Sequence, residues 1–301
     1  MSTPSDIRFL VSLKVEPKAA IDQVHLIDAL VTIDRQDRHF RVEVDPESCE
    51  IILRGQSEQH LDFVVHRLIN GFKIGVVCGA PQVAYRETVT TSGQAQFTCD
   101  KSTSGQRQFA RVALRVEPLA RDSGNKFESD FIDHPLIDKF SAAVRKGVAS
   151  VLSNGVLAGF PITDVKVTWI DGSFHENFST PVTFEIAARG ALREACNAGK
   201  IAILEPIMQV EAAAPARYTG ALLSDFNKRR AQVFDQRLRD GVSAVRAYVP
   251  LANMFGYQSA LRSVSDGQAT HSMRFSHYAE VPRNIAGNDP GNFPPAIGMR
   301  A

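Results

Sequence analysis

The sequence contains few residues of the kinds that cross-link a chain, and it carries almost no net charge. Its 301 residues include four cysteines and one tryptophan, and 34 basic side chains balance 33 acidic ones. The cysteines, Cys49, Cys78, Cys99 and Cys196, are spaced too irregularly for a paired zinc site or a disulfide framework. The charge balance excludes a protein that is basic throughout, such as a histone, but it is compatible with a local RNA-binding patch.

Long apolar runs and targeting segments are also missing. No stretch approaches about 18 uninterrupted apolar residues, and residues 1–6 lack the basic and apolar regions of a signal peptide. Hydrophobic residues nevertheless make up 44% of the chain, as in ordinary globular proteins. We therefore expect a soluble cytoplasmic protein with reduced thiols, no membrane partner, and two or three domains.

Motifs of common catalytic and nucleotide-binding sites are absent from the sequence. The one Gly-Lys pair, Gly199-Lys200, is followed by Ile201 and does not end a phosphate-binding loop. There is no Gly-x-Ser-x-Gly elbow, no His-Glu-x-x-His motif, and no pairing of Cys with His suited to a metal or a nucleophile. We predict that this chain alone is not an enzyme and has no catalytic residues, no metal and no cofactor.

Apolar periodicity over residues 1–79 predicts the element order βαββαβ. Strands are expected at 7–15, 40–44, 51–53 and 74–77. The residues expected to face the core are Ile21, Val24, Ile27, Leu30 and Val31 from the first helix, and Leu61, Val64, Val65, Leu68, Ile69 and Phe72 from the second. Ser57 is the expected N-cap of the second helix. This order is the split-βαβ, or ferredoxin-like, plan.

The last third, 201–283, repeats this order of elements without repeating the sequence. Strands are expected at 206–211, 232–237, 242–249 and 268–278, with helices starting near Pro215 and spanning about 251–263. Arg239-Asp240-Gly241 is the expected hairpin turn, in which glycine supplies a positive φ. We predict a second ferredoxin-like module, followed by an extended or disordered tail at 284–301.

The middle of the chain, 80–200, follows a different pattern. Strands are expected near 84–91, 95–99, 109–117 and 162–169, with helices at 135–154 and 181–197 and a polar loop at 171–179. The second helix is expected to run through Val182, Ile186 and Leu192. Gly155 is expected just past the end of the first helix. The predicted fold class is therefore α+β, with two ferredoxin-like modules flanking a central α+β domain.

The near-zero net charge hides a difference between these segments. Residues 1–79 carry 9 basic and 12 acidic side chains, for a net charge of −3, whereas 201–283 carry 10 and 7, for +3. The middle segment, 80–200, carries a net charge of +1. The C-terminal module is thus the electrostatically favoured partner for a polyanion.

Three polar segments are candidate RNA contacts. The loop at 171–179 holds His175 among aromatic residues and outside any helical or strand period, so RNA contact competes there with an ordinary solvated loop. Lys228, Arg229 and Arg230 end a helix, where cations suit either phosphate or the helix dipole. The loop 101–108 bears two cations, and solvent exposure alone would account for it.

Sequence motifs along nearly the whole chain resemble one family. They are 55–61 (GQSEQHL), 80–88 (APQVAYRET), 154–162 (NGVLAGFPI), 171–175 (DGSFH), 204–208 (LEPIM), 249–257 (VPLANMFGY) and 277–282 (HYAEVP), with 226–230 (FNKRR) a weaker match. In sequence and order these motifs are similar to the C-terminal half of elongation factor G, the translocation GTPase. The resemblance spans about 7–283.

The resemblance implies functional residues as well as a fold. Segments 1–79, 80–200 and 201–283 would correspond to the third, fourth and fifth domains of the family. Two tip loops of the fourth domain would contact tRNA and mRNA in the decoding region of the ribosome, here through Ser104, Gly105, Gln106 and Arg107 and through His175, Glu176 and Asn177. Lys228, Arg229 and Arg230 would contact rRNA. The GTPase domain, which binds GTP and magnesium, has no counterpart in these residues and would be a partner in cis or in trans.

The tip loops also depart from the family pattern. In the first loop, 104–112, three glycines and a histidine of the usual motif are replaced, which reduces the freedom of φ. In the second loop, Phe178 and Pro181 stand where acidic residues are common. These changes indicate a divergent paralogue. The alternatives are a ribosomal-protection type of protein, and a stand-alone interaction or ligand-sensing protein. An enzyme using His175 as acid or base lacks an obvious partner residue.

Overall fold

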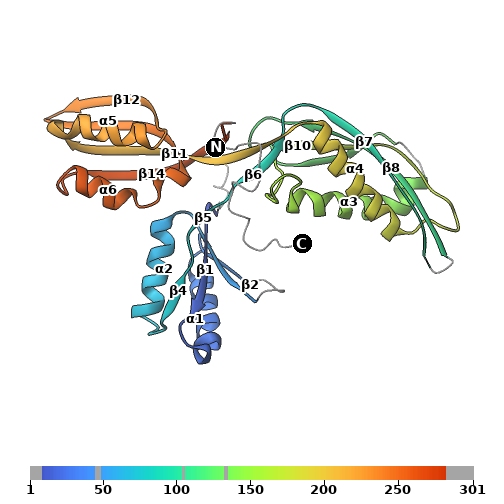
Figure 1. Cartoon of the computed structure of the whole chain (residues 1–301), viewed down its shortest axis with the longest axis horizontal. Helices are drawn as coiled ribbons and strands as arrows, with labels where there is room; N and C mark the ends of the chain where they lie inside the picture. The colour runs from blue at the N-terminus through green and yellow to red at the C-terminus, as the bar shows by residue number, and fades with distance from the viewer. Residues whose placement is uncertain (1–8, 45–48, 104–105, 132–134, 283–301) are drawn as a thin grey trace. The chain divides into compact units, whose positions relative to one another are not determined.

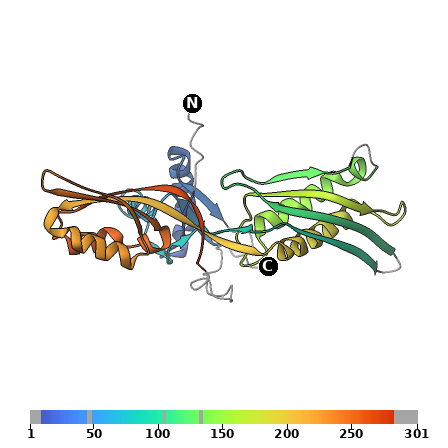
Figure 2. The ribbon, with the colours of Figure 1, turned by 90° about the horizontal axis from the view of Figure 1, so that it is seen from above.

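The computed structural model describes residues 9–44, 49–103, 106–131 and 135–282, and Figure 1 and Figure 2 show the ribbon from two directions. Among the described residues, those from 9 to 84 and Glu205–Ala279 form one compact unit, and Tyr85–Leu204 with 280–282 form a second. The boundaries predicted for three domains stay a prediction, and the predicted tail at 284–301 lies outside the described residues. None of the described helices is long and apolar enough to cross a membrane.

The N-terminal module of the first unit has the predicted βαββαβ order. Its elements are β1 (Val11–Pro17), the 3-10 turn η1 (Ala20–Asp22), α1 (Gln23–Gln36), β2 (Arg41–Val44), β3 (Ile51–Gly55), α2 (Glu58–Asn70) and β4 (Val76–Cys78). The strands form an antiparallel sheet in the order β2-β3-β1-β4, and β5 (Gln82–Val83) also pairs with β1. Ser57 caps α2 as predicted, because its side chain accepts a hydrogen bond from the His60 N–H.

The core face predicted for α1 is wrong at its start. Ile21 and Val24 are 84% and 67% exposed. The buried residues of α1 are Leu26, Ala29, Leu30 and Ile33. Each residue turns a helix by about 100°, so residues repeated strictly every three positions drift around the helix and cannot share one face. Ile69 and Phe72, predicted to be buried at the end of α2, are exposed as well.

The second ferredoxin-like module forms the C-terminal part of the first unit, except for 201–204 and Glu280, which belong to the second unit. Its elements are β11 (Ile201–Pro215), η2 (Ala216–Tyr218), α5 (Thr219–Lys228), β12 (Gln232–Arg239), β13 (Val242–Pro250), η3 (Leu251–Met254), α6 (Tyr257–Val264) and β14 (Thr270–Glu280). The sheet order is β12-β13-β11-β14, and Figure 1 shows α5 and α6 beside this sheet. Asp240 and Gly241 both have positive φ, 52° and 78°, at the predicted hairpin turn. Both ferredoxin-like plans are therefore confirmed.

The second unit is built on a four-stranded sheet in the order β7-β8-β10-β9. Its elements are β6 (Arg86–Val89), β7 (Gly93–Thr103), β8 (Gln106–Pro118), β9 (Lys126–Ser129), α3 (Pro135–Asn154), β10 (Val165–Ser173) and α4 (Pro181–Ala198). Strand β9 was not predicted from the sequence; it runs parallel to β10, with α3 between them in the chain. β6 pairs with the first four residues of β11. Gly155 follows α3 with a φ of 69°, as predicted.

The predicted helix at 181–197 is confirmed as α4, and it buries a face made largely of alanines. Val182 and Ile186 are 65% and 38% exposed, although Leu192 is buried. The buried face consists of Thr183, Phe184, Ala187, Ala188, Ala191, Leu192, Ala195 and Cys196. The many alanines allow α4 to pack closely on β7, β8 and α3. A prediction that places the largest aliphatic residues in the core misses such a face.

A buried carboxylate joins two distant segments of the second unit. Glu87 of β6 is fully buried. Its oxygens accept hydrogen bonds from the backbone N–H groups of Val156, Leu157, Ala158 and Phe160, at distances between 2.7 and 3.2 Å. Gly155 and Gly159 have positive φ, which lets the loop after α3 turn its N–H groups toward the carboxylate. The motifs at 80–88 and 154–162 thus meet at one buried side chain.

Candidate nucleic-acid interface

The two segments predicted as tip loops lie side by side in the second unit. The loop predicted at 101–108 is strand where the structure describes it, because 101–103 end β7 and 106–108 begin β8. The second segment connects β10 to α4. The Phe109 N–H donates to the Phe178 carbonyl at 3.0 Å, and the Ser179 hydroxyl donates to the Phe109 carbonyl at 2.5 Å. These bonds continue the pairing of β8 with β10, which reaches Arg111 and Ser173. The structure therefore brings the two loops together at one end of the sheet.

His175 is held in a defined orientation within its loop. Its ring stacks on Phe178, with 4.3 Å between ring centroids and an interplanar angle of 26°. The Asn177 N–H donates to His175 Nδ1 at 3.2 Å. Because Nδ1 accepts this bond, Nε2 carries the proton in the neutral ring. The exposed imidazole therefore presents a hydrogen-bond donor and one ring face.

Arg107 also contacts the Phe178 ring on which His175 stacks. Its guanidinium donates to both carboxylate oxygens of Asp100, at 3.2 and 2.9 Å, and its carbon lies 6.0 Å from the Phe178 ring centroid. These hydrogen bonds lower the pKa of Asp100 below its usual value. Phe178 is thus contacted by the imidazole of its own loop and by a guanidinium from β8.

The structure places the predicted tip residues in different environments. His175, Glu176 and Asn177 are all exposed, and Arg107 joins His175 through Phe178. Gln106 is the first residue of β8, whereas Ser104 and Gly105 lie outside the described residues. Phe178 stood out in the sequence only as a departure from the family pattern. Its spacing of three residues from His175 was the signal that it could stack on that ring.

The three cations at the end of α5 do not share one environment. Lys228 is exposed. Arg229 donates to Asp225 at 2.8 Å and lies 4.9 Å from the Tyr257 ring centroid. Arg230 binds Glu205, which is 3% exposed, at 2.7 and 3.3 Å. Two of the three predicted rRNA contacts are thus engaged within the chain, and their role toward RNA stays a prediction.

Replacing Arg230 and Lys228 separately distinguishes structural from RNA-binding roles. Arg230→Ala leaves the buried Glu205 carboxylate without its bidentate partner, and we expect the free energy of unfolding to fall by about 2 kcal/mol. Lys228→Ala is expected to change stability by less than about 0.5 kcal/mol. Urea denaturation followed by circular dichroism measures both. Equal stability of the two variants would contradict a structural role for Arg230.

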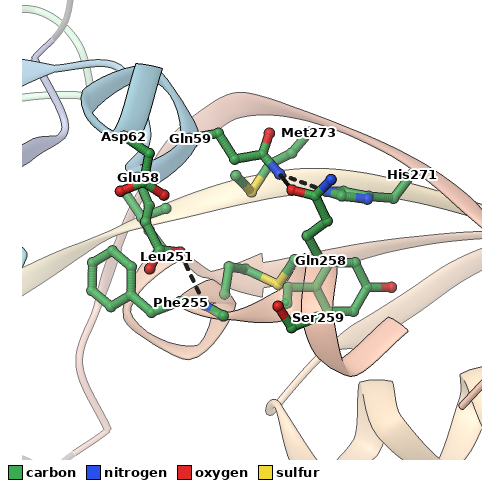
Figure 3. A pocket seen from close by; sticks show the side chains of 12 residues that line it. Glu58, Gln59, Asp62, Leu251, Phe255, Gln258, Ser259, His271 and Met273 are labelled. Atoms are coloured by element: carbon green, nitrogen blue, oxygen red, sulfur yellow. Dashed lines mark hydrogen bonds between the residues drawn. The ribbon is translucent and has the colours of Figure 1, made fainter. Parts of the chain in front are cut away.

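A small pocket lies within the first unit, between α2 and the segment from η3 to β14 (Figure 3). Glu58 accepts a 2.9 Å bond from the Gly256 N–H, and the Gln59 amide lies 3.4 Å from His271 Nε2. Burial lowers the pKa of His271, which favours its neutral form. The volume of about 130 Å³ is below the roughly 300–1,000 Å³ of typical small-molecule sites. This pocket is therefore smaller than a typical small-molecule site.

Metal-ligating and nucleophilic groups are not clustered in the described residues. No group of three or more His, Cys, Asp or Glu side chains in 9–44, 49–103, 106–131 and 135–282 could hold a metal ion. Cys99 and Cys196 are buried, and burial raises the pKa of Cys196 to about 12. A thiol with this pKa is protonated and unreactive at neutral pH.

Comparison with known proteins matches almost the whole chain. The profile "Elongation Factor G, domain III" matches residues 8–80, "Elongation factor G, domain IV" matches 81–200, and "Elongation factor G C-terminus" matches 202–288. The chain is 46% identical over 277 residues to elongation factor G of Rhodopseudomonas palustris (strain BisB18), covering 92% of this chain and 40% of that protein. A crystal structure from Thermus thermophilus matches with a TM-score of 0.71 and 32% identity, covering 94% of this chain and 42% of that one. The chain thus spans less than half the length of these relatives.

Proposed function

Because the chain belongs to the elongation factor G family, with its domains III and IV and its C-terminus, we propose that it is the ribosome-binding part of a translation elongation factor. Joined to a GTPase domain, in cis or in trans, it promotes the movement of tRNA and mRNA through the ribosome in the cytoplasm. GTP and magnesium bind that GTPase domain. The part described above contributes binding and positioning rather than catalytic residues.

The geometry at the two joined loops carries this proposal. Stacking on exposed rings and hydrogen bonds to exposed base edges are the usual means of contacting unpaired RNA. The free face and the Nε2–H of His175 offer both, and Phe178 holds the ring in place. Because this orientation exists before RNA arrives, less conformational entropy is lost on binding. His175, Glu176 and Asn177 contact tRNA or mRNA in this proposal, with Arg107 beside them.

Ribosome binding is expected to depend steeply on salt. Cations that neutralise phosphates release condensed counterions, so affinity should fall at least about ten-fold between roughly 50 and 200 mM salt. Pelleting the protein with ribosomes over this range measures the effect, and Lys228→Ala should reduce the slope. A chain that does not sediment with ribosomes at about 50 mM salt would contradict the proposal.

Replacing His175 with alanine tests the role of the tip. In a protein that includes the GTPase domain, we expect single-round translocation to slow by roughly ten-fold, because a stacking contact and a hydrogen bond are lost. GTP hydrolysis should be unchanged. Glu194→Ala, at an exposed position of α4, serves as the control. Unchanged translocation would remove His175 from this role, and tight ribosome binding without translocation would favour the ribosomal-protection alternative.

A further inference from the structure

The sheet of the C-terminal module has one open face. On β13, Ser243, Val245, Ala247 and Val249 are buried. Side chains alternate between the two faces of a strand, so Ala244, Arg246 and Tyr248 point the opposite way. These three residues are half-buried and pair directly with Ala213, Glu211 and Gln209 of β11. Residues directly opposite one another in an antiparallel pair share a face. The open face therefore crosses β13 and β11.

Aromatic rings form a row across this face. Phe234 of β12 stacks on Tyr248 with 4.6 Å between ring centroids and an interplanar angle of 27°. The ring of His277 of β14 meets Tyr248 edge-on at 5.6 Å. An irregularity in the pairing between Val233 and Asp235 brings Phe234 to this face. Phe234 is 46% exposed, which is high for a phenylalanine in a sheet.

Arginines lie on the same face as the aromatic row. Arg237 and Arg239 of β12 pair with Ala244 and Val242, so they belong to the open face. Their side chains are 69% and 91% exposed. Arg274 of β14 donates to Gln209 at 2.9 and 3.2 Å, beside Tyr248. With Arg246, the face carries four arginines.

The acidic groups on the same face are fewer. Asp235 and Glu211 lie 3.6 and 2.8 Å from Arg246, and Arg237 lies 2.9 Å from Asp235. Asp240, at the hairpin turn, lies 3.5 Å from Arg239. Arginine outnumbers carboxylate on the strands, and the two most exposed arginines lie along β12 between Phe234 and the hairpin turn. This pattern complements a polyanion whose bases can stack.

We propose that this face binds unpaired nucleotides of single-stranded RNA, with a base stacked against Phe234 and phosphates held by Arg237, Arg239 and Arg274. The surface is separate from the loops around His175 and does not include Lys228. The inference shares with the proposed function only the nature of the ligand. Flat rings at strand spacing suit bases, because every base has an apolar face, whereas a duplex hides its bases from such a surface.

The test uses the full chain and a fluorescein-labelled oligoribonucleotide of about 12 nucleotides, either single-stranded or annealed to its complement. Fluorescence anisotropy at about 50 mM salt should show tighter binding of the single strand. Phe234→Ala should weaken that binding by at least about five-fold, and Phe234→Tyr should retain it because the ring is kept. Leu238→Ala, which removes a 68% exposed side chain from the other face of β12, should have no effect.

Comparison with His175→Ala separates this inference from the proposed function. If the two surfaces bind separate oligonucleotides, each substitution should weaken only its own site, so His175→Ala should leave the fold-loss caused by Phe234→Ala unchanged. Equal binding by wild type and Phe234→Ala, with both folded by circular dichroism, would overturn the inference and leave the tip proposal standing. Equal affinity for single strand and duplex would overturn it too, because it would show phosphate binding without base stacking.

Discussion

Replacing Glu87 with glutamine is expected to lower the free energy of unfolding of the second unit by about 3–5 kcal/mol. The carboxylate is fully buried and accepts from four backbone N–H groups. Glutamine has nearly the same shape, but it removes the negative charge and points an amide N–H₂ group at donors. Buried donors that lose their acceptor pay the cost of desolvation without a compensating bond. This substitution changes the side-chain volume very little but alters all four of these hydrogen bonds.

The only tryptophan in the sequence makes this measurement specific to the unit concerned. Trp169 is buried in the core of the second unit. Its fluorescence during urea denaturation therefore reports the unfolding of that unit. Glu117→Gln is the matched control, because Glu117 lies on β8 of the same unit and is 39% exposed. A Glu87→Gln midpoint equal to that of the control would show that the N–H groups find other acceptors.

Phe184→Ala is the second substitution with a large expected effect, again about 3–5 kcal/mol of unfolding free energy. Phe184 is fully buried and stacks on Phe140, with ring centroids 4.0 Å apart and an angle of 12°. Its ring also meets Trp169 edge-on at 6.4 Å. Phe140 in turn contacts Phe174, the residue before His175. Loss of Phe184 should therefore leave a cavity and also loosen the support beneath the His175 loop.

Val182→Ala is the control for Phe184→Ala, because it removes an apolar side chain from the exposed side of the same helix. We expect it to change stability by less than about 0.5 kcal/mol. The urea midpoint of each variant, rather than its fluorescence intensity, is compared, since Phe184 lies next to the tryptophan. A large loss of stability in Val182→Ala would contradict the exposed position of this side chain.

Periodicity predicts element order well in this protein because each ferredoxin-like sheet buries one face under its helices. The alternation of apolar residues and the turn at Asp240-Gly241 follow directly from that layering. Ser57 was predictable as an N-cap because its hydroxyl satisfies a backbone donor within one helical turn. These features depend only on residues that are close together in the chain, so they can be predicted from a single sequence.

The interactions that were not predicted are contacts between residues far apart in the sequence. Nothing near Glu87 indicates that a loop about seventy residues later supplies its four donors. Arg107 and Phe178 were known only as members of two loops, and their contact depends on the pairing of β8 with β10. The burial of α4 through alanines also depends on how closely its neighbours approach. Local patterns do not encode such distances.

The contacts of β6 determine which residues must be kept together when this unit is transferred to another protein. Besides the Glu87 contacts, β6 pairs with Ile201–Leu204 of β11, and the Val281 N–H donates to the Ile203 carbonyl at 2.9 Å. Phe160, Ile203 and Val281 form one hydrophobic cluster. A transplanted segment that starts after Glu87 or stops at residue 200 would leave these partners behind. A chimaera that keeps this unit intact must carry 85–204 together with a compatible residue 281. The unit is therefore built from two separate segments of the chain, and both must be transferred.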